Sequence, residues 1–430
     1  MMQGSWRSAA VSVAVAAAVC TMVVTGASGA NAAPGSTWGA AQEVPGTAAL
    51  NSGGSAVVIS VSCASAGNCA AGGVYTDTSG HAQAYVASEV NGTWHAAIEV
   101  PGTAALNQGG DAQVYSVSCA SAGNCAAGGW YTDSSGKRQA FVAGEVNGTW
   151  HTAREMPGTA ALNSGGSATV ISVSCASAGN CAAGGAYTDN SGSDQAFVAS
   201  EVSGTWHTAR EMPGTAALNS GGEAVVSSVS CASAGNCAAG GYYLDNSGHA
   251  QAYVASEVNG TWHTAIEVPG TAALNHRYAQ VYSVSCASAG NCAAGGVYTD
   301  TSHRHQAFVA SEANGTWHAA IEVPGTAALN QGGRAQVGSV SCASPGNCAA
   351  GGGYTDSADH GQVFVASEVN GTWHAAIEVP GTAALNQGGR AVVFSVSCAS
   401  AGNCAAGGFY TDSSRHGQAF VVNEAQAGSP

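Results

Sequence analysis

Histidine and arginine side chains are the groups in this sequence best suited to bind a ligand, and most of them gather in its C-terminal part. They break an otherwise regular repeat at His276, Arg277, His303, Arg304, His305, Arg334, His360, Arg390, Arg415 and His416. Arginine binds carboxylate and phosphate groups with paired hydrogen bonds. This set, the basic sector, therefore predicts a binding site for an anionic ligand such as an acidic glycan or a cell-wall polymer.

Two other interpretations of the basic sector remain open. Imidazole nitrogens bind transition metals, so His276, His303 and His305 could form a metal site. Exposed loops also tolerate substitution, so the whole set could have arisen without a function. We carry the anion site forward and expect neither a metal nor a cofactor.

Two aromatic residues, Trp130 and Tyr242, extend the candidate site. They occupy one variable position of the repeat, which elsewhere holds Val74, Ala186, Val297, Gly353 and Phe409. A large ring at this position could stack on a sugar, or it could fill a gap in the core.

Fourteen cysteines form seven C-x5-C pairs, and a fifteenth, Cys20, stands apart near the N-terminus. The pairs are Cys63 and Cys69, Cys119 and Cys125, Cys175 and Cys181, Cys231 and Cys237, Cys286 and Cys292, Cys342 and Cys348, and Cys398 and Cys404. Each pair flanks a five-residue loop, which places the two cysteines opposite one another at a distance that a disulfide can span. Zinc would need four ligands, so we expect seven disulfides.

The residues that repeat in every unit have structural explanations. Asp77 and its equivalents begin a T-D-x-S-G turn, where an aspartate caps its own turn. Trp94 and its equivalents are expected to pack between blades or under the hairpin, and an aromatic platform for carbohydrate is the functional alternative. The histidine that follows each tryptophan is expected on the solvated face. Neither set singles out a catalytic residue, because catalysis needs a unique constellation.

The elements that carry these residues come from seven copies of one unit. The tryptophans at positions 38, 94, 150, 206, 262, 317 and 373 are spaced 56 residues apart, with one spacing of 55. Apolar and small polar residues alternate within the unit, which indicates strands. In the first unit we predict strands at 56–63, 69–76, 83–90 and 93–100, with an Asn91-Gly92 hairpin turn between the last two.

The array begins and ends with complementary parts of a unit. A lone fourth strand at 37–44 opens it, and three strands at 392–424 close it. Four-stranded units linked from an outer strand to the next inner strand are typical of propellers. We therefore predict an all-β, seven-bladed β-propeller of four-stranded antiparallel blades, its ring closed by pairing of the N-terminal strand with the three C-terminal strands. A linear solenoid is the alternative.

This architecture would bring the basic sector together. Its residues fall in the turn between the second and third strands or in the long loop between blades, and both emerge at the same end of a blade. We call this end the loop face. The other end, with the cysteine loop and the Asn-Gly turn, is nearly identical in all units, and we call it the hairpin face.

The N-terminus resembles a secretion signal. Arg7 precedes the apolar stretch 9–24, and small residues follow, with Ala30-Asn31-Ala32 as a cleavage site. We expect a signal peptide at 1–33 and the seven-repeat propeller at 34–430. The mature protein would be secreted and extracellular, without a membrane span.

Composition excludes one class of partner. The chain has 10 Lys and Arg against 25 Asp and Glu, and a formal net charge of −15. Proteins that bind the phosphate backbone are basic, so no nucleic-acid binding is expected.

The repeated string S-V-S-C-A-S-A-G-N-C-A-A-G-G resembles the repeat of secreted actinobacterial proteins with S-x-S-C-x5-C-A-x-G units that are predicted to be seven-bladed propellers. The hairpin from Ser88 to Trp94 is also similar to the Asp-box of sialidase-like propellers, although no aspartate follows the serine. The first resemblance implies a propeller of unassigned function, and the second carries no catalytic residue across.

Three functions follow from these observations. The leading one is a monomeric, non-catalytic binding or scaffold module for an extracellular glycan, cell-wall polymer or protein. A sialidase-like glycoside hydrolase or lyase is the second, but the arginine cluster that a sialidase needs is not evident, because Arg154 and Arg210 are predicted on outer strands. A structural coat protein of the cell surface is the third.

Overall fold

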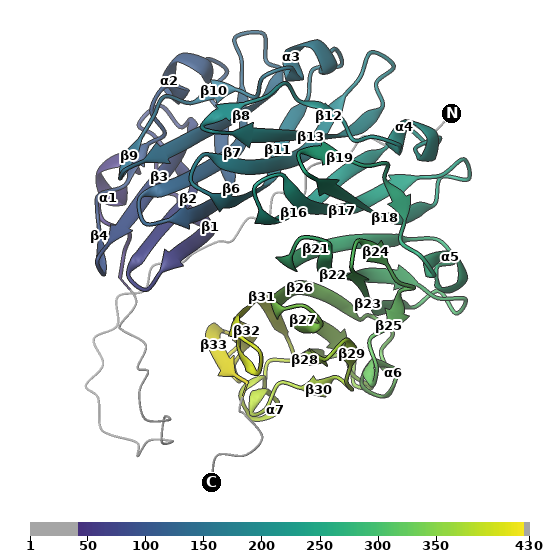
Figure 1. Ribbon diagram of the computed structural model, residues 1–430. Helices are drawn as coiled ribbons and strands as arrows, with labels where there is room; N and C mark the ends of the chain where they lie inside the picture. The colour runs from purple at the N-terminus through teal and green to yellow at the C-terminus, as the bar shows by residue number, and fades with distance from the viewer. Residues whose placement is uncertain (1–41, 425–430) are drawn as a thin grey trace, which may run out of the picture. The chain divides into compact units, whose positions relative to one another are not determined.

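The computed structural model describes residues 42–424, and each repeat unit within them forms one antiparallel sheet (Figure 1). These seven sheets are blades 1 to 7 of an all-β propeller, as predicted. The expected signal peptide and residues 34–41 lie outside the described residues.

Three long strands form the body of each blade. The first strands are β1 (Ala56–Ser65), β6 (Ala112–Ser121), β11 (Ala168–Ser177), β16 (Ala224–Ser233), β21 (Ala279–Ser288), β26 (Gln336–Ser344) and β31 (Ala391–Ser400). The second strands are β2 (Asn68–Thr76), β7 (Asn124–Thr132), β12 (Asn180–Thr188), β17 (Asn236–Leu244), β22 (Asn291–Thr299), β27 (Asn347–Thr355) and β32 (Asn403–Thr411). The third strands are β3 (Ala82–Val90), β8 (Arg138–Val146), β13 (Asp194–Val202), β18 (Ala250–Val258), β23 (His305–Ala313), β28 (Gly361–Val369) and β33 (Gly417–Asn423).

The predicted fourth strand is in fact two short pieces. The first pieces are β4 (Thr93–Trp94), β9 (Thr149–Trp150), β14 (Thr205–Trp206), β19 (Thr261–Trp262), β24 (Thr316–Trp317) and β29 (Thr372–Trp373). The second pieces are β5 (Ile98–Glu99), β10 (Arg154–Glu155), β15 (Arg210–Glu211), β20 (Ile266–Glu267), β25 (Ile321–Glu322) and β30 (Ile377–Glu378). The strand breaks because the Ala97 N–H turns away and donates to the Pro45 carbonyl oxygen at 2.6 Å.

The loop between blades contains a single helical turn that the sequence pattern did not predict. These turns are α1 (Thr47–Leu50), α2 (Thr103–Leu106), α3 (Thr159–Leu162), α4 (Thr215–Leu218), α5 (Thr271–Leu274), α6 (Thr326–Leu329) and α7 (Thr382–Leu385). Gly102 precedes α2 with φ 87°, a conformation that favours glycine. No helix in the described part of the chain has the length and apolar character of a membrane span.

All seven expected disulfides are present. Cys63 and Cys69 pair directly across β1 and β2, with their Cα atoms 3.9 Å apart, and the other six pairs repeat this arrangement. Each disulfide therefore fixes one hairpin within its own blade.

Successive blades pack through their first strands. Val114 and Val117 of β6 lie over Gly72 of β2, where an added Cβ would come within 2.6 Å of Val114 and 2.7 Å of Val117. The hydroxyls of Ser60 and Ser62 accept backbone N–H groups of the same β6 strand. This contact recurs between each later pair of neighbouring blades, so the glycine of each blade receives two valines of the next.

A β-bulge in every first strand sets the position of one variable side chain. In β1 the pairing shifts between Val58 and Ser60, so Ile59 has no partner residue in β2. Bulges redirect side chains and are common near binding sites. The residues at this position are Ile59, Tyr115, Ile171, Ser227, Tyr282, Gly338 and Phe394.

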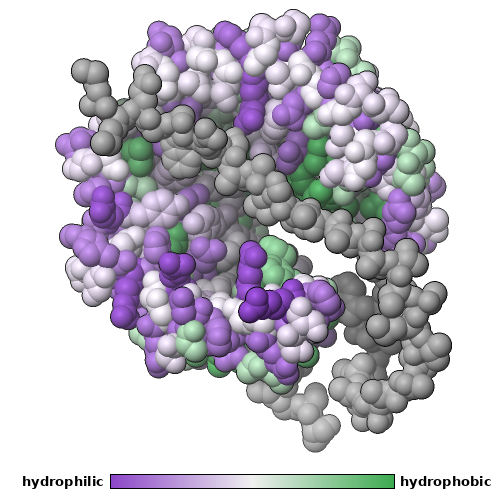
Figure 2. Space-filling model, turned by 180° about the vertical axis from the view of Figure 1, so that it is seen from behind, coloured by the Kyte–Doolittle hydropathy of each residue, from purple (hydrophilic) through white to green (hydrophobic). Residues whose placement is uncertain are grey.

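The two ends of the described array have complementary surfaces. Val58 and Val61 of β1 are 41% and 55% exposed, whereas the equivalent Val114 and Val117 are 0% and 5% exposed. At the other end, a Cβ added to Gly407 would meet nothing closer than 3.7 Å among the described residues. On the face drawn in Figure 2, hydrophobic residues (green) are visible in several separate places among hydrophilic ones (purple). Closure of the ring remains a prediction, and it would pack these valines over this glycine.

Alanine at Gly407 tests ring closure. At the equivalent Gly184, a Cβ would lie 2.5 Å from a methyl group of Val226, so Gly184→Ala is expected to destabilise the fold by about 1–3 kcal/mol. If the ring closes, Gly407→Ala lowers the thermal midpoint of the full chain as much as Gly184→Ala does. Gly353→Ala is the control, because its Cβ has space. A midpoint unchanged by Gly407→Ala would contradict closure.

Candidate functional site

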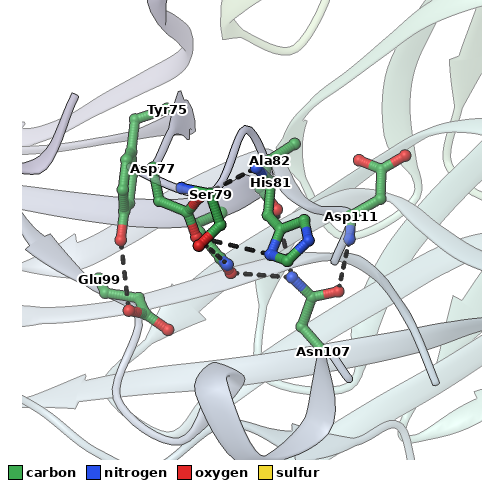
Figure 3. A network of polar contacts seen from close by, with 9 residues as sticks. Tyr75, Asp77, Ser79, His81, Ala82, Glu99, Asn107 and Asp111 are labelled. Carbon is green, nitrogen blue, oxygen red and sulfur yellow. Dashed lines mark hydrogen bonds and ion pairs between the residues drawn. The ribbon is translucent and has the colours of Figure 1, made fainter. Parts of the chain in front are cut away.

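An aspartate organises each turn of the loop face, as expected from the sequence. One carboxylate oxygen of Asp77 accepts the N–H groups of Ser79 and His81 at 2.8 and 2.9 Å. Its other oxygen accepts the Gln83 side-chain amide at 2.9 Å. The turn between β2 and β3 is thereby fixed to the start of β3 (Figure 3).

An asparagine then joins this turn to the loop that leads into the next blade. The Asn107 amide donates to the Gln83 side chain at 2.8 Å and to the Ala82 carbonyl oxygen at 3.2 Å. Its oxygen accepts the Asp111 N–H at 2.8 Å (Figure 3). Because the same pattern holds in later blades, variable residues of the turn and of the following loop lie side by side.

This arrangement brings much of the basic sector together in blades 5 and 6. The ring of His276 lies 5.3 Å from that of His303. The start of β23 at His305 forms a parallel bridge with Arg334. The aliphatic part of the Arg304 side chain lies over Gly333, where an added Cβ would come within 2.9 Å of the Arg304 Cδ atom. Arg304 is therefore close to Arg334, which follows Gly333 in the chain.

Other members of the sector lie apart from this group. His360 lies over Gly389, next to Arg390, whose guanidinium is 5.3 Å from the centre of the Phe409 ring. The remaining residues are exposed: Arg277 in the loop before β21, and Arg415 and His416 in the turn between β32 and β33. No group of three or more possible metal ligands occurs within residues 42–424.

Trp130 and Tyr242 have partners within the protein. Trp130 is 4% exposed, and the Arg138 guanidinium lies 3.9 Å from its ring centre. The Tyr242 hydroxyl donates to the Glu223 carboxylate. Arg138 therefore covers the buried Trp130 ring, and the Tyr242 hydroxyl is already engaged by a carboxylate of its own blade.

A groove of about 580 Å³ lies next to His305 and Arg334. We call it the Gly338 groove, and its lining includes Tyr278, Tyr282, His305, Arg334, Gln336, Gly338 and Gly353. Gly338 is the bulge residue of β26, where blade 2 has Tyr115, and Gly353 stands where blade 2 has Trp130. The groove therefore exists because two positions that hold larger side chains in most other blades are both glycines here.

The tyrosines supply polar groups to this groove. The ring of Tyr278 is 6.1 Å from that of His305. Burial raises the pKa of Tyr278, so its phenol stays protonated at neutral pH, and its hydroxyl donates to the Gln280 side-chain oxygen. Sequence reasoning missed Tyr278, Tyr282 and Gly338. The signal that could have found them is the loss of bulk at two repeat positions in one unit.

Comparison with known proteins leaves the family open. The sequence matches no protein-family profile, and no curated protein is similar to it in sequence. Solved structures with the same kind of fold include the Hadza microbial sialidase Hz136, with 12% identity over 85% of this chain and a TM-score of 0.39. The chain spans 65% of that sialidase.

Two further structures belong to proteins with other activities. A fucose-specific lectin from Aleuria aurantia shares 12% identity over 70% of this chain and 88% of its own, with a TM-score of 0.35. An ulvan lyase of polysaccharide lyase family PL25 shares 10% identity over 84% of this chain and 91% of its own, with a TM-score of 0.43. At these identities the likeness concerns the propeller fold alone.

Asp189 provides a test of the turn network. Hydrogen bonds, above all from the Ser191 hydroxyl and then from Gln195, lower the pKa of Asp189 to about 2. A lowered pKa contributes stability above the unfolded value of about 3.9, and this stability is lost as the pH falls to about 2. Asp189→Asn should therefore lower the thermal midpoint at about pH 6, with the difference from wild type closing between about pH 4 and pH 2. A difference that is constant over this range would contradict the role of the carboxylate.

Proposed function

We propose that this protein is a secreted, non-catalytic propeller that binds an anionic glycan or cell-wall polymer through the loop face of blades 5 to 7. The Gly338 groove is the observation that carries this proposal. Arg334 supplies a permanent positive charge there, His305 adds a second nitrogen donor, and the rings of Tyr278 and Tyr282 supply surfaces for sugar units.

The negative net charge of the chain implies that an anionic ligand would be held by a small group of basic residues and not by the protein surface as a whole. With a net charge of −15, the protein repels polyanions at long range. Binding of an anionic polymer would then depend on the few residues in contact with it, and Arg334, Arg304 and His305 lie within one such patch.

The lining of the groove favours binding over hydrolysis. Among the described residues, no aspartate or glutamate lines it. Most glycoside hydrolases use a pair of carboxyl groups. The nearby Asp356 is already engaged in its own turn, where it accepts N–H groups from Ala358, His360 and Gln362.

The disulfides support a location outside the cytoplasm. Seven disulfides are typical of proteins that fold and work in oxidising compartments. We propose that the mature chain acts there as a monomer, with an extracellular glycan, cell-wall polymer or surface protein as its partner.

Co-sedimentation with insoluble polysaccharides and purified cell walls tests the proposal. The oxidised wild type is expected to bind at least one acidic polymer, and salt should weaken the binding because exposed charges are screened. Arg334→Ser combined with Arg390→Ser and Arg415→Ser should reduce bound protein about tenfold. Gly338→Tyr, which fills the groove, should have a similar effect without removing a charge.

Lys137→Ser is the matched control for these variants. Lys137 stands at the turn position of blade 2 that corresponds to Arg304, and it is equally exposed. It should leave binding unchanged. Equal loss in the control would indicate a general charge effect, and no binding to any polymer would favour a structural coat protein.

A lyase is the second candidate, favoured by the meeting of His305, Tyr278 and Arg334 in one groove. In such a reaction a base removes the proton beside a uronate carboxylate, the C4–O bond breaks and a C4–C5 double bond forms. His305 would serve as the base and the protonated phenol of Tyr278 as the acid, with Arg334 on the carboxylate. Ultraviolet absorbance of an unsaturated product, lost in His305→Ala, would establish this activity.

A further inference from the structure

A serine hydroxyl joins neighbouring blades near the hairpin face. The Ser88 hydroxyl of blade 1 donates to the Glu145 carboxylate of blade 2 at 2.6 Å. It also accepts the Trp150 indole N–H at 2.9 Å. The hydroxyl thus satisfies a buried acceptor and a buried donor at once.

The same three groups recur between later blades. The Ser200 hydroxyl donates to Glu257 at 2.7 Å and accepts from Trp262 at 3.2 Å. Equivalent contacts join Ser256 to Glu312 and Trp317, and Ser311 to Glu368 and Trp373. The contact is therefore a standard part of the boundary between blades.

The boundary between blades 2 and 3 lacks this hydroxyl, because Gly144 replaces the serine. Glu201 and Trp206 keep the positions of the other two groups. Among the described residues, no hydrogen bond reaches the Glu201 carboxylate or the Trp206 indole N–H. The backbone is unchanged, since the Gly144 carbonyl oxygen accepts the His151 N–H at 2.8 Å as Ser88 accepts that of His95.

The place that the serine side chain would take at this boundary is not filled by other atoms. A Cβ added to Gly144 would meet only one atom within 4 Å, the Cys125 carbonyl oxygen at 4.0 Å. A cavity of about 270 Å³ lies here, lined in part by Gly144, Glu201, Trp206 and Arg154. This volume is near the lower end for small-molecule sites, which suits one sugar ring.

A second break in the repeat falls in the same cavity. Arg154 occupies the position that holds isoleucine in four other blades, at Ile98, Ile266, Ile321 and Ile377. Its side chain is exposed, so its guanidinium is accessible from solvent. Arg154 and Glu201 both line this cavity, so one ligand could contact both. Burial raises the pKa of Glu201, and the charge of Arg154 opposes that rise.

We propose that this cavity binds a saccharide unit, with one sugar hydroxyl in the place that the serine hydroxyl takes at other boundaries. That hydroxyl donates to the Glu201 carboxylate and accepts the Trp206 indole N–H. Arg154 donates to a second oxygen of the same sugar. The site is on the hairpin face and does not depend on the proposed function of the loop face.

The neighbouring boundary provides a matched comparison. Between blades 3 and 4, a similar cavity of about 250 Å³ contains Arg210, Glu257 and Trp262, with Ser200 still present. The two boundaries thus differ chiefly in one hydroxymethyl group. Gly144→Ser should abolish the proposed site, and Ser200→Gly should create a second one.

The experiment follows the indole N–H signals of ¹⁵N-labelled, oxidised protein by NMR while monosaccharides are added one at a time. The probes are L-fucose, D-mannose, D-galactose, N-acetyl-D-glucosamine and D-glucuronate. Trp206→Phe assigns the Trp206 signal. At least one probe is expected to shift the Trp206 signal saturably, and Gly144→Ser should weaken that binding at least about tenfold.

Two controls keep the result interpretable. Gly144→Ser should keep or raise the thermal midpoint, because it restores two hydrogen bonds, so lost binding would not reflect unfolding. Ser200→Gly should make the Trp262 signal respond as well, whereas Lys137→Ser on the loop face should leave the response of Trp206 unchanged. No response of Trp206 to any probe, or undiminished binding in Gly144→Ser, would overturn the proposal.

Discussion

Each blade is held to the next by two valines packed over a glycine, and this contact determines where every other group of the propeller lies. A side chain at the glycine would force the blades apart, since the methyl groups of Val114 and Val117 already occupy the position of a Cβ at Gly72. The hydroxyls of Ser60 and Ser62 accept N–H groups of β6 and so fix how far β6 is shifted along β1. The polar networks of both faces, whose hydrogen bonds are about 3 Å long, require this registry to be kept along the array.

In this repeated scaffold, the residues that hold the blades together are distinct from those that vary on the surface. Residues that are identical in every unit maintain the blade boundaries, and single departures from the repeat alter the surface without disturbing them. Gly338 removes a ring at a bulge, and Gly144 removes one hydroxyl at a boundary. Both departures are losses of side-chain atoms. The first leaves space beside His305 and Arg334, and the second leaves space beside Glu201.

Much of the fold could be predicted from the sequence because its signals are local. The alternation in 56–63, the C-x5-C spacing and the Asn91-Gly92 turn each lie within one hairpin, and the structure has the corresponding strands and disulfide. The break in the outer strand was not predictable in this way. It depends on the hydrogen bond from Ala97 to Pro45, between residues about fifty positions apart.

The candidate sites were harder to predict for the same reason. The exposure of the basic residues was expected from their loops, but the grouping of His305 and Arg334 with Tyr278 and Tyr282 depends on packing between blades. The importance of Gly144 is visible only when the partners of Ser88 are known. The contacts of Ser88 join residues 57 and 62 positions apart, and the alternation within a single unit gives no information about them.

The confinement of each disulfide to one hairpin has a consequence for the history of the gene. Cys63 and Cys69 are separated by six positions, and no disulfide of the described residues joins different units. Recombination between near-identical repeats can therefore insert or delete whole units without leaving an unpaired thiol. The number of blades can change during evolution while oxidative folding proceeds unit by unit.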